Sequence, residues 1–122
     1  MEPLRADMFD EICPSTLNPI RFGNDKWAGL VIRCLEDGPR RFSELRIPLH
    51  RVTPKVLTQS LRLLERDGLI HRTERTTPVR RVDYALTPLG QSFLAPMQAA
   101  CEWTATHWTE LLDAREDASI RN

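Results

Sequence analysis

A predicted helix over residues 53–67 carries side chains suited to hydrogen bonding on one side and apolar side chains on the other. Leu57, Leu61 and Leu64 recur at the i, i+4, i+7 spacing of a single helical face. The nearly opposite side bears one amide and three cations, Lys55, Gln59, Arg62 and Arg66. A glutamine can pair with adenine through two hydrogen bonds, and an arginine or a lysine with guanine. The alternative is an ordinary solvated cationic face.

Further candidates for contact with DNA lie at the start of this helix and at the tip of a predicted hairpin. The N-terminal end of such a helix usually reaches the bases, and here it adds Thr53 and Thr58. Arg66, further along, is expected to reach a phosphate. The backbone N–H groups at the helix start can also bind a phosphate. Three basic residues at the hairpin tip are expected to touch the DNA backbone or the minor groove: Arg75, Arg80 and Arg81.

The charge of the chain is unevenly distributed, although the formal net charge is zero. Residues 33–81 contain 12 Arg and Lys against 6 Asp and Glu. Residues 1–32 contain 3 against 5, and residues 82–122 contain 2 against 6. A basic middle between acidic ends indicates a surface for a polyanion in the middle. The plainer interpretation is that arginine is a common surface residue.

Signatures of catalysis and of metal or cofactor binding are missing from the sequence. It contains no Gly-rich phosphate loop, no G-x-S-x-G and no H-E-x-x-H. His50, His71 and His107 are far apart and lack a Cys or carboxylate set at metal-ligand spacing. We therefore expect neither an enzyme nor a cofactor.

The length of 122 residues suggests one domain. We expect an N-terminal arm over 1–14, a single domain over 15–116 and a frayed tail over 117–122. No apolar run approaches the ~20 residues of a membrane helix, and the acidic N-terminus does not resemble a signal peptide. Three cysteines without a C-x-x-C pair fit a reducing compartment. We therefore expect a cytoplasmic protein without a membrane partner.

Local patterns predict the helices that precede the one described first. A short helix ends at Gly23, and a second is capped by Asn24 or Asp25 and ended by Gly38-Pro39.

A third, short helix and the helix over 53–67 follow. Ser43 is the expected N-cap of the third helix. Thr53 caps the fourth helix, Pro54 takes its first position and Gly68 ends it. Helix, short link and helix make the helix-turn-helix arrangement.

The period of the pattern then changes to that of a strand. Val82, Tyr84 and Leu86 alternate with other residues, as in a half-buried strand. The segment TTPVR before it has turn character, so we expect a hairpin with a basic tip.

A last, long helix is predicted to begin at Thr87-Pro88 and to be kinked by Pro96 in its third turn. An apolar stripe follows one of its sides and is too apolar for a small domain to leave in water. The stripe includes Phe93, Met97, Ala100 and Trp108.

The chain resembles the HxlR-type winged helix-turn-helix transcription regulators of bacteria. The matching segments are CPSTLNPIRFGNDKWAGLVIRCLEDGPRRFSELR, TPKVLTQSLRLLERDGLIHRT and VRRVDYALTPLGQSFLAPMQAACEW. They extend from about Cys13 to Trp103. The resemblance implies an α+β, mainly helical fold: a winged helix-turn-helix with an extra N-terminal helix and a long C-terminal dimerisation helix.

The resemblance also implies a function. It predicts a homodimer that binds double-stranded DNA sequence-specifically at an inverted repeat, with half-sites about 34–36 Å apart. The stripe Phe93, Met97, Ala100 and Trp108 would then lie in the dimer interface. One alternative is a winged-helix module that binds proteins. Another is a regulator whose DNA binding is switched by a small-molecule effector or by oxidation of Cys13.

Cys13 is the candidate redox sensor because some members of this family sense oxidants through a cysteine near this position. A helix start would lower the pKa of its thiol and favour the thiolate. The alternative is that Cys13-Pro14 merely begins the first helix. Cys34 and Cys101 are expected to be core residues rather than sensors.

Overall fold

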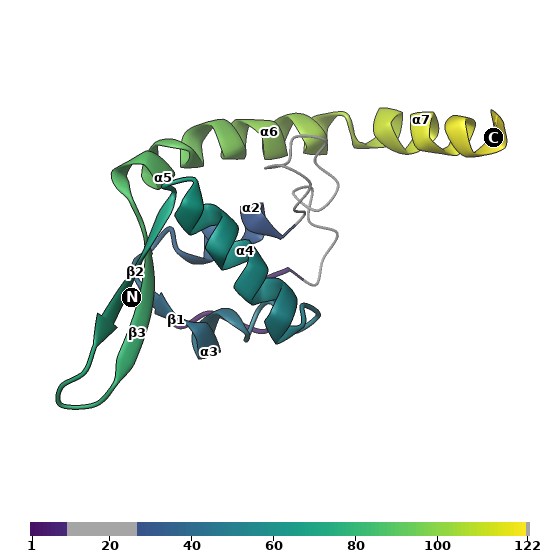
Figure 1. The fold of residues 1–122 in the computed structure, drawn as a ribbon. Helices are drawn as coiled ribbons and strands as arrows, with labels where there is room; N and C mark the ends of the chain where they lie inside the picture. The colour runs from purple at the N-terminus through teal and green to yellow at the C-terminus, as the bar shows by residue number, and fades with distance from the viewer. Residues whose placement is uncertain (10–26, 122) are drawn as a thin grey trace.

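The computed structural model describes residues 1–9 and 27–121 and shows a winged helix (Figure 1). The elements are α2 (Ala28–Cys34), β1 (Arg40–Arg41), α3 (Phe42–Leu45), α4 (Pro54–Arg66), β2 (Ile70–Arg75), β3 (Arg81–Leu86), α5 (Pro88–Ser92), α6 (Leu94–Thr106) and α7 (Trp108–Arg121). The strands form one antiparallel sheet in the order β1-β3-β2. Helices α3 and α4 form the helix-turn-helix, and β2 and β3 form the wing. The predicted fold class, a mainly helical α+β winged helix-turn-helix, is therefore confirmed.

Two predicted helix ends fall on residues that the structure does not describe. The short helix ending at Gly23 and the cap at Asn24 or Asp25 both lie outside the described residues.

In the part that is described, no helix is both long and apolar enough to cross a membrane.

Helix α4 begins as the sequence predicts, because its first turn is determined locally. The Thr53 hydroxyl oxygen accepts a hydrogen bond from the Val56 N–H at 3.2 Å, and Pro54 occupies the first helical position. Proline is tolerated there since that N–H has no partner within a helix.

The end of α4 also agrees with the prediction and shows why Gly68 is needed. Gly68 has φ +77°, a left-handed conformation that only glycine adopts without strain. The Gly68 N–H donates to the Glu65 carbonyl at 3.1 Å, and the Leu69 N–H donates to the Leu64 carbonyl at 3.0 Å. These two bonds form a Schellman motif, which satisfies carbonyls at the helix end.

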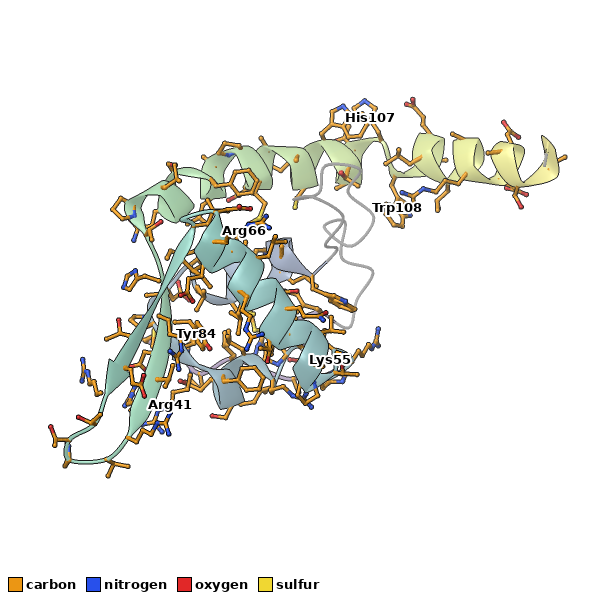
Figure 2. The ribbon with its side chains drawn as sticks, in the orientation of Figure 1. Arg41, Lys55, Arg66, Tyr84, His107 and Trp108 are labelled. Atoms are coloured by element: carbon orange, nitrogen blue, oxygen red, sulfur yellow. The ribbon has the colours of Figure 1, made fainter. Side chains whose placement is uncertain are left out.

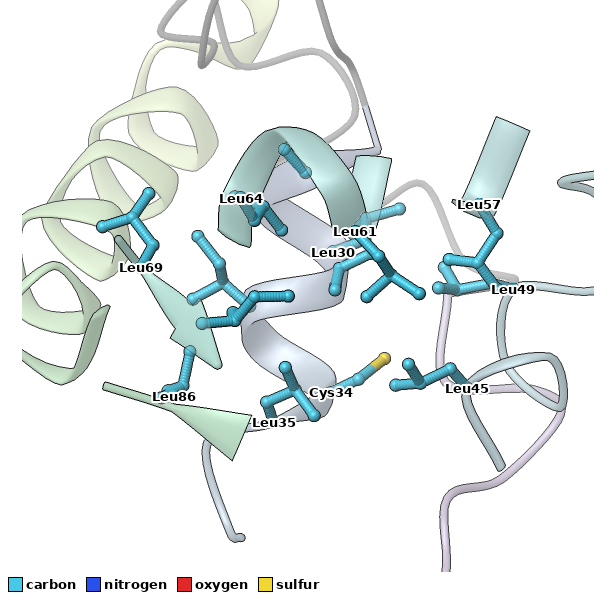
Figure 3. Close-up of a cluster of buried hydrophobic side chains, with 14 of the residues drawn as sticks. Leu30, Cys34, Leu35, Leu45, Leu49, Leu57, Leu61, Leu64, Leu69 and Leu86 are labelled. Carbon is cyan, nitrogen blue, oxygen red and sulfur yellow. The ribbon is translucent and has the colours of Figure 1, made fainter. Parts of the chain in front are cut away.

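The apolar face of α4 lies in the core of the protein (Figure 3). Leu57, Leu61 and Leu64 are almost fully buried and pack with leucines of α2 and of the turn before α4. Burying each such side chain contributes about 1.5–3 kcal/mol relative to exposure. Because this face points inward, the opposite face of α4 points to solvent.

Helices α2 and α3 differ from the prediction at their ends. α2 ends at Cys34, about one turn before Gly38-Pro39, and residues 35–37 form turns. α3 begins at Phe42, and its N-cap is Arg41 rather than Ser43. The Glu44 side chain accepts from the Arg41 N–H at 2.9 Å, so the carboxylate of the third helical residue stabilises the start of α3.

Mutation of Thr53 and mutation of Ser43 should have different effects on stability, because only Thr53 caps a helix in the structure. Thr53→Ala removes the bond to Val56 N–H and should lower the free energy of unfolding by about 1 kcal/mol. Ser43→Ala is the matched control and should change it by less than about 0.5 kcal/mol, because Ser43 is an exposed residue inside α3. Urea denaturation of the two variants measures both values. Equal losses would contradict the assignment of Thr53 as the cap.

The pairing of β2 with β3 divides the wing into two faces. Ile70 pairs with Leu86 and both are buried, so the face they share is the one that covers the core. Side chains alternate between faces along a strand. Arg72 therefore shares this face with Ile70, whereas Arg75 belongs to the opposite face.

The predicted long C-terminal helix is divided into three pieces. α5 starts with the Thr87 cap and Pro88, as predicted, but the helix is interrupted at Phe93 and again at His107. Pro96 lies in the first turn of α6 and has no N–H to donate to the Ser92 carbonyl, so the predicted irregularity is present but falls one turn earlier, at Phe93. The expected frayed tail is helical in the structure, since α7 extends to Arg121.

The beginning of the N-terminal arm is attached to the sheet through a buried arginine. Arg40 is 2% exposed, donates to the Glu2 carbonyl at 2.7 Å and lies 3.8 Å from the Glu44 carboxylate. Leu4 also joins the core. Residues 1–9 thus lack helix and strand but pack against the domain.

Candidate nucleic-acid interface

The solvent side of α4 presents a row of polar side chains that make few contacts within the protein. Lys55, Gln59 and Arg62 are exposed. Among residues 1–9 and 27–121, none of the three has a hydrogen-bond or ion-pair partner. Figure 2 shows Lys55 and Arg66 near opposite ends of the helix. This row has the composition that reads base edges in a major groove.

The other candidates on α4 already have partners. The Thr58 hydroxyl donates to the Pro54 carbonyl at 2.8 Å, so its proton is used inside the helix. The Thr53 oxygen caps the helix. Arg66 Nε donates to Asp67 Oδ1 at 3.2 Å in an exposed pair, which is weak in water.

The three arginines predicted at the hairpin tip have different surroundings. Arg81 Nε donates to both carboxylate oxygens of the buried Asp83, at 2.9 and 3.1 Å, so it also has a structural role. Arg80 Nε lies 3.2 Å from Glu74 Oε1 in an exposed pair. Arg75 is exposed and has no hydrogen-bond or ion-pair partner among the described residues.

A hollow of about 430 Å³ lies between α4 and the wing and contains two residues absent from the predicted site. Arg72 of β2 and Tyr84 of β3 face Arg62 across it, and the two wing residues pair in register. Strand alternation from the buried Ile70 could have placed Arg72 on this side. The sequence alone does not reveal the register that brings Tyr84 beside it. The hollow is lined by Thr58, Leu61, Arg62, Glu65, Arg72 and Tyr84.

The predicted apolar stripe is only partly used in the core of the chain, and its last member, Trp108, lies on α7. Met97 is 9% exposed and belongs to the core of this one chain, while Phe93, Ala100 and Trp108 are half-buried. Other apolar side chains of α6 and α7 remain exposed: Trp103, Leu112 and Ile120.

The described cysteines lie in or near the core. Burial raises the pKa of the Cys34 thiol to about 12, so this thiol stays protonated and inert at neutral pH. Cys101 is half-buried beside Met97 and Arg33. Cys13 lies outside the described residues.

No three His, Cys, Asp or Glu side chains of the described residues come together as metal ligands.

Comparisons with known proteins agree with this architecture. A family model for HxlR-like helix-turn-helix proteins matches residues 23–111. The HTH-type transcriptional regulator YtfH of Escherichia coli (strain K12), whose own role is uncharacterized, is 33% identical over 112 residues, which cover 92% of this chain and 88% of YtfH.

Solved structures of regulators have the same fold. The redox regulator HypR in its reduced form matches with a TM-score of 0.66 and 30% identity, covering 75% of this chain and 89% of HypR. The reduced form of the transcriptional regulator YodB from B. subtilis matches with a TM-score of 0.60 and 32% identity, covering 63% of this chain and 76% of YodB.

Proposed function

Because the chain belongs to the HxlR-like helix-turn-helix family of transcription regulators, we propose that it binds double-stranded DNA sequence-specifically. The observation that carries this proposal is the solvent face of α4, where Lys55, Gln59 and Arg62 have their donors and acceptors available. A helix exposed in this way fits the major groove, which is about 12 Å wide. Lys55, Gln59 and Arg62 would read bases there, with Thr53 and Thr58 beside them, and Arg66 would bind a phosphate. Arg75, Arg80 and Arg81 of the wing would add contacts to the DNA backbone.

The protein would act as a homodimer on an inverted repeat. Support comes from α6 and α7, which carry Trp103 and Leu112 exposed by 48% and 44%. Large apolar side chains left exposed on the C-terminal helices of a small domain favour an interface. Phe93, Ala100 and Trp108 are half-buried and can contribute area, whereas Met97 is used mainly in the core of its own chain. Two-fold symmetry would place the two copies of α4 about 34–36 Å apart.

A titration by fluorescence anisotropy tests this function. The probes are fluorescein-labelled duplexes from the region upstream of the protein's own gene and a random duplex of equal length, each over a series of NaCl concentrations. Tight, salt-sensitive binding that prefers the upstream DNA is the expected result. Lack of binding to both duplexes at low salt would contradict the proposal and favour a module that binds proteins.

A second proposed property is control of DNA binding by oxidation of Cys13. The similarity to HypR, which is described as a redox regulator, favours it. We expect diamide, which oxidises thiols to disulfides, to change the Kd for the upstream duplex in the wild type and to leave Cys13→Ser unaffected. Cys34→Ser is the control and should respond like the wild type, because its thiol is buried. A full diamide response in Cys13→Ser would exclude Cys13 as the sensor.

A further inference from the structure

The hollow between α4 and the wing has a composition suited to an anion. Its α4 wall contributes Arg62, and its wing wall contributes Arg72 and Tyr84. The guanidinium groups carry fixed positive charge and the phenol supplies a hydroxyl donor. The floor includes Leu61, which is buried in the core, so the hollow has a rigid base.

The charge of Arg72 is only partly balanced within the protein. Its Nη1 lies 3.8 Å from Glu74 Oε2, beyond hydrogen-bond distance, and its side chain is 41% exposed. Glu74 is also paired with Arg80, whose Nε is closer, at 3.2 Å. One carboxylate is thus shared by two arginines, and Arg72 keeps donors for an external anion.

B-DNA geometry determines what would occupy this hollow. The major and minor grooves are separated by a single sugar–phosphate strand, so a protein with a helix in one groove and a hairpin over the next must straddle that strand. We propose that the hollow receives this strand and that Arg72 and Tyr84 bind its phosphate. The inference rests on the proposed DNA binding and adds two residues to it.

The wing offers a matched control for Arg72. Arg75 is on the same strand and is also exposed, but it belongs to the face directed away from α4. It can contact other phosphates but not the one between α4 and the wing. The two arginines should therefore respond differently when single phosphates of the DNA are made neutral.

Removing the charge of Glu65 should strengthen DNA binding, whereas removing the charge of Arg72 should weaken it. Its carboxylate lines the hollow and would repel a phosphate seated there. Glu65→Gln keeps the shape of the side chain and removes the charge. We expect this variant to bind DNA about two- to threefold more tightly at low salt.

The experiment uses a fluorescein-labelled duplex, the upstream sequence bound best by the wild type, with one methylphosphonate moved in steps across a half-site. At one position, neutralising the phosphate should weaken wild-type binding about tenfold. At that position, the same neutralisation should weaken binding by the Arg72→Ala variant less than about twofold. It should weaken binding by the Arg75→Ala variant by the full factor of about ten. Arg72→Ala should also lower the salt slope by about one, while Arg72→Lys should restore it. Tyr84→Phe should weaken binding of the unmodified duplex and lose most of its effect at that same position.

The possible results separate this inference from the proposed function. If the wild type binds no duplex, both are wrong. If it binds with salt dependence, but Arg72→Ala keeps the wild-type slope or loses affinity at every methylphosphonate position, only the assignment of the hollow is overturned. Circular dichroism melting of each variant shows whether it is folded, and Arg72→Lys provides the second test if Arg72→Ala is not.

Discussion

Gly90→Ala should lower the free energy of unfolding by about 3 kcal/mol, the largest loss we expect from a single methyl group in this chain. A Cβ atom at Gly90 would collide with the carbonyl oxygen of Leu69 and lie 3.0 Å from its carbonyl carbon. That oxygen cannot rotate away, because it also accepts the Thr87 N–H at 3.0 Å. The joint between the end of α4 and the start of α5 would have to open. Thermal unfolding should show a decrease in Tm of about 10–15 °C.

Gly29→Ala is the matched control, and it should raise the free energy of unfolding instead of lowering it. Gly29 also lies in a helix, but a Cβ there would meet only Met97 Sδ at 3.8 Å, an ordinary contact. Removing a helical glycine then stabilises by about 0.5–1 kcal/mol. If both variants were stabilised, the result would contradict the close packing of Gly90 in α5 against the Leu69 carbonyl.

Gln59→Ala should weaken binding to the specific duplex by about 1–3 kcal/mol, or about 5- to 150-fold in Kd, with little change on random DNA. Gln59 lies in the middle of the exposed face of α4, where its amide is available for a bidentate pair with adenine. Arg62→Ala should behave in the same way at a neighbouring base pair. The measurement is anisotropy titration of the duplex and of variants with single base-pair changes.

Gln98→Ala serves as the control for the loss of an exposed glutamine. Gln98 lies on α6, where its amide donates to Glu102 at 3.4 Å, away from the proposed DNA-binding face. It should bind both duplexes as the wild type does. Equal losses on specific and random DNA for Gln59→Ala would show that Gln59 contributes affinity but does not read a base.

The elements that the sequence predicts correctly are those whose ends are determined by nearby residues. α4 is the clearest case, since Thr53 and Pro54 set its start and Gly68 its end through contacts within a few residues. The start of α5 at Thr87-Pro88 is confirmed for the same reason.

The errors concern features that depend on distant residues. Ser43 looks like a cap, but the pairing of Arg40 and Arg41 with β3 sets where α3 begins. The importance of Gly90 is equally hidden, because its close neighbour Leu69 precedes it by a whole hairpin.

The DNA-binding candidates show the same division. The exposed row on α4 follows from helical period alone, and the structure places its members on one face. The wing residues depend on strand register, which the sequence pattern left open. Arg81 is thus engaged with Asp83, while Arg72, which the prediction omitted, lies in the hollow beside α4.

The interruption at His107 provides a joint about which α7 can rotate as a rigid unit relative to α6. Helical geometry is lost at that residue, whose ring stacks on Trp103 of the last turn of α6 with the ring centroids 4.6 Å apart. α7 extends away from the body for 14 residues, or about 21 Å (Figure 1). A change of about 15° at the joint would move its far end by about 5 Å. In a dimer joined through these helices, a small rotation at His107 would alter the distance between the two copies of α4 without any change within α4 itself.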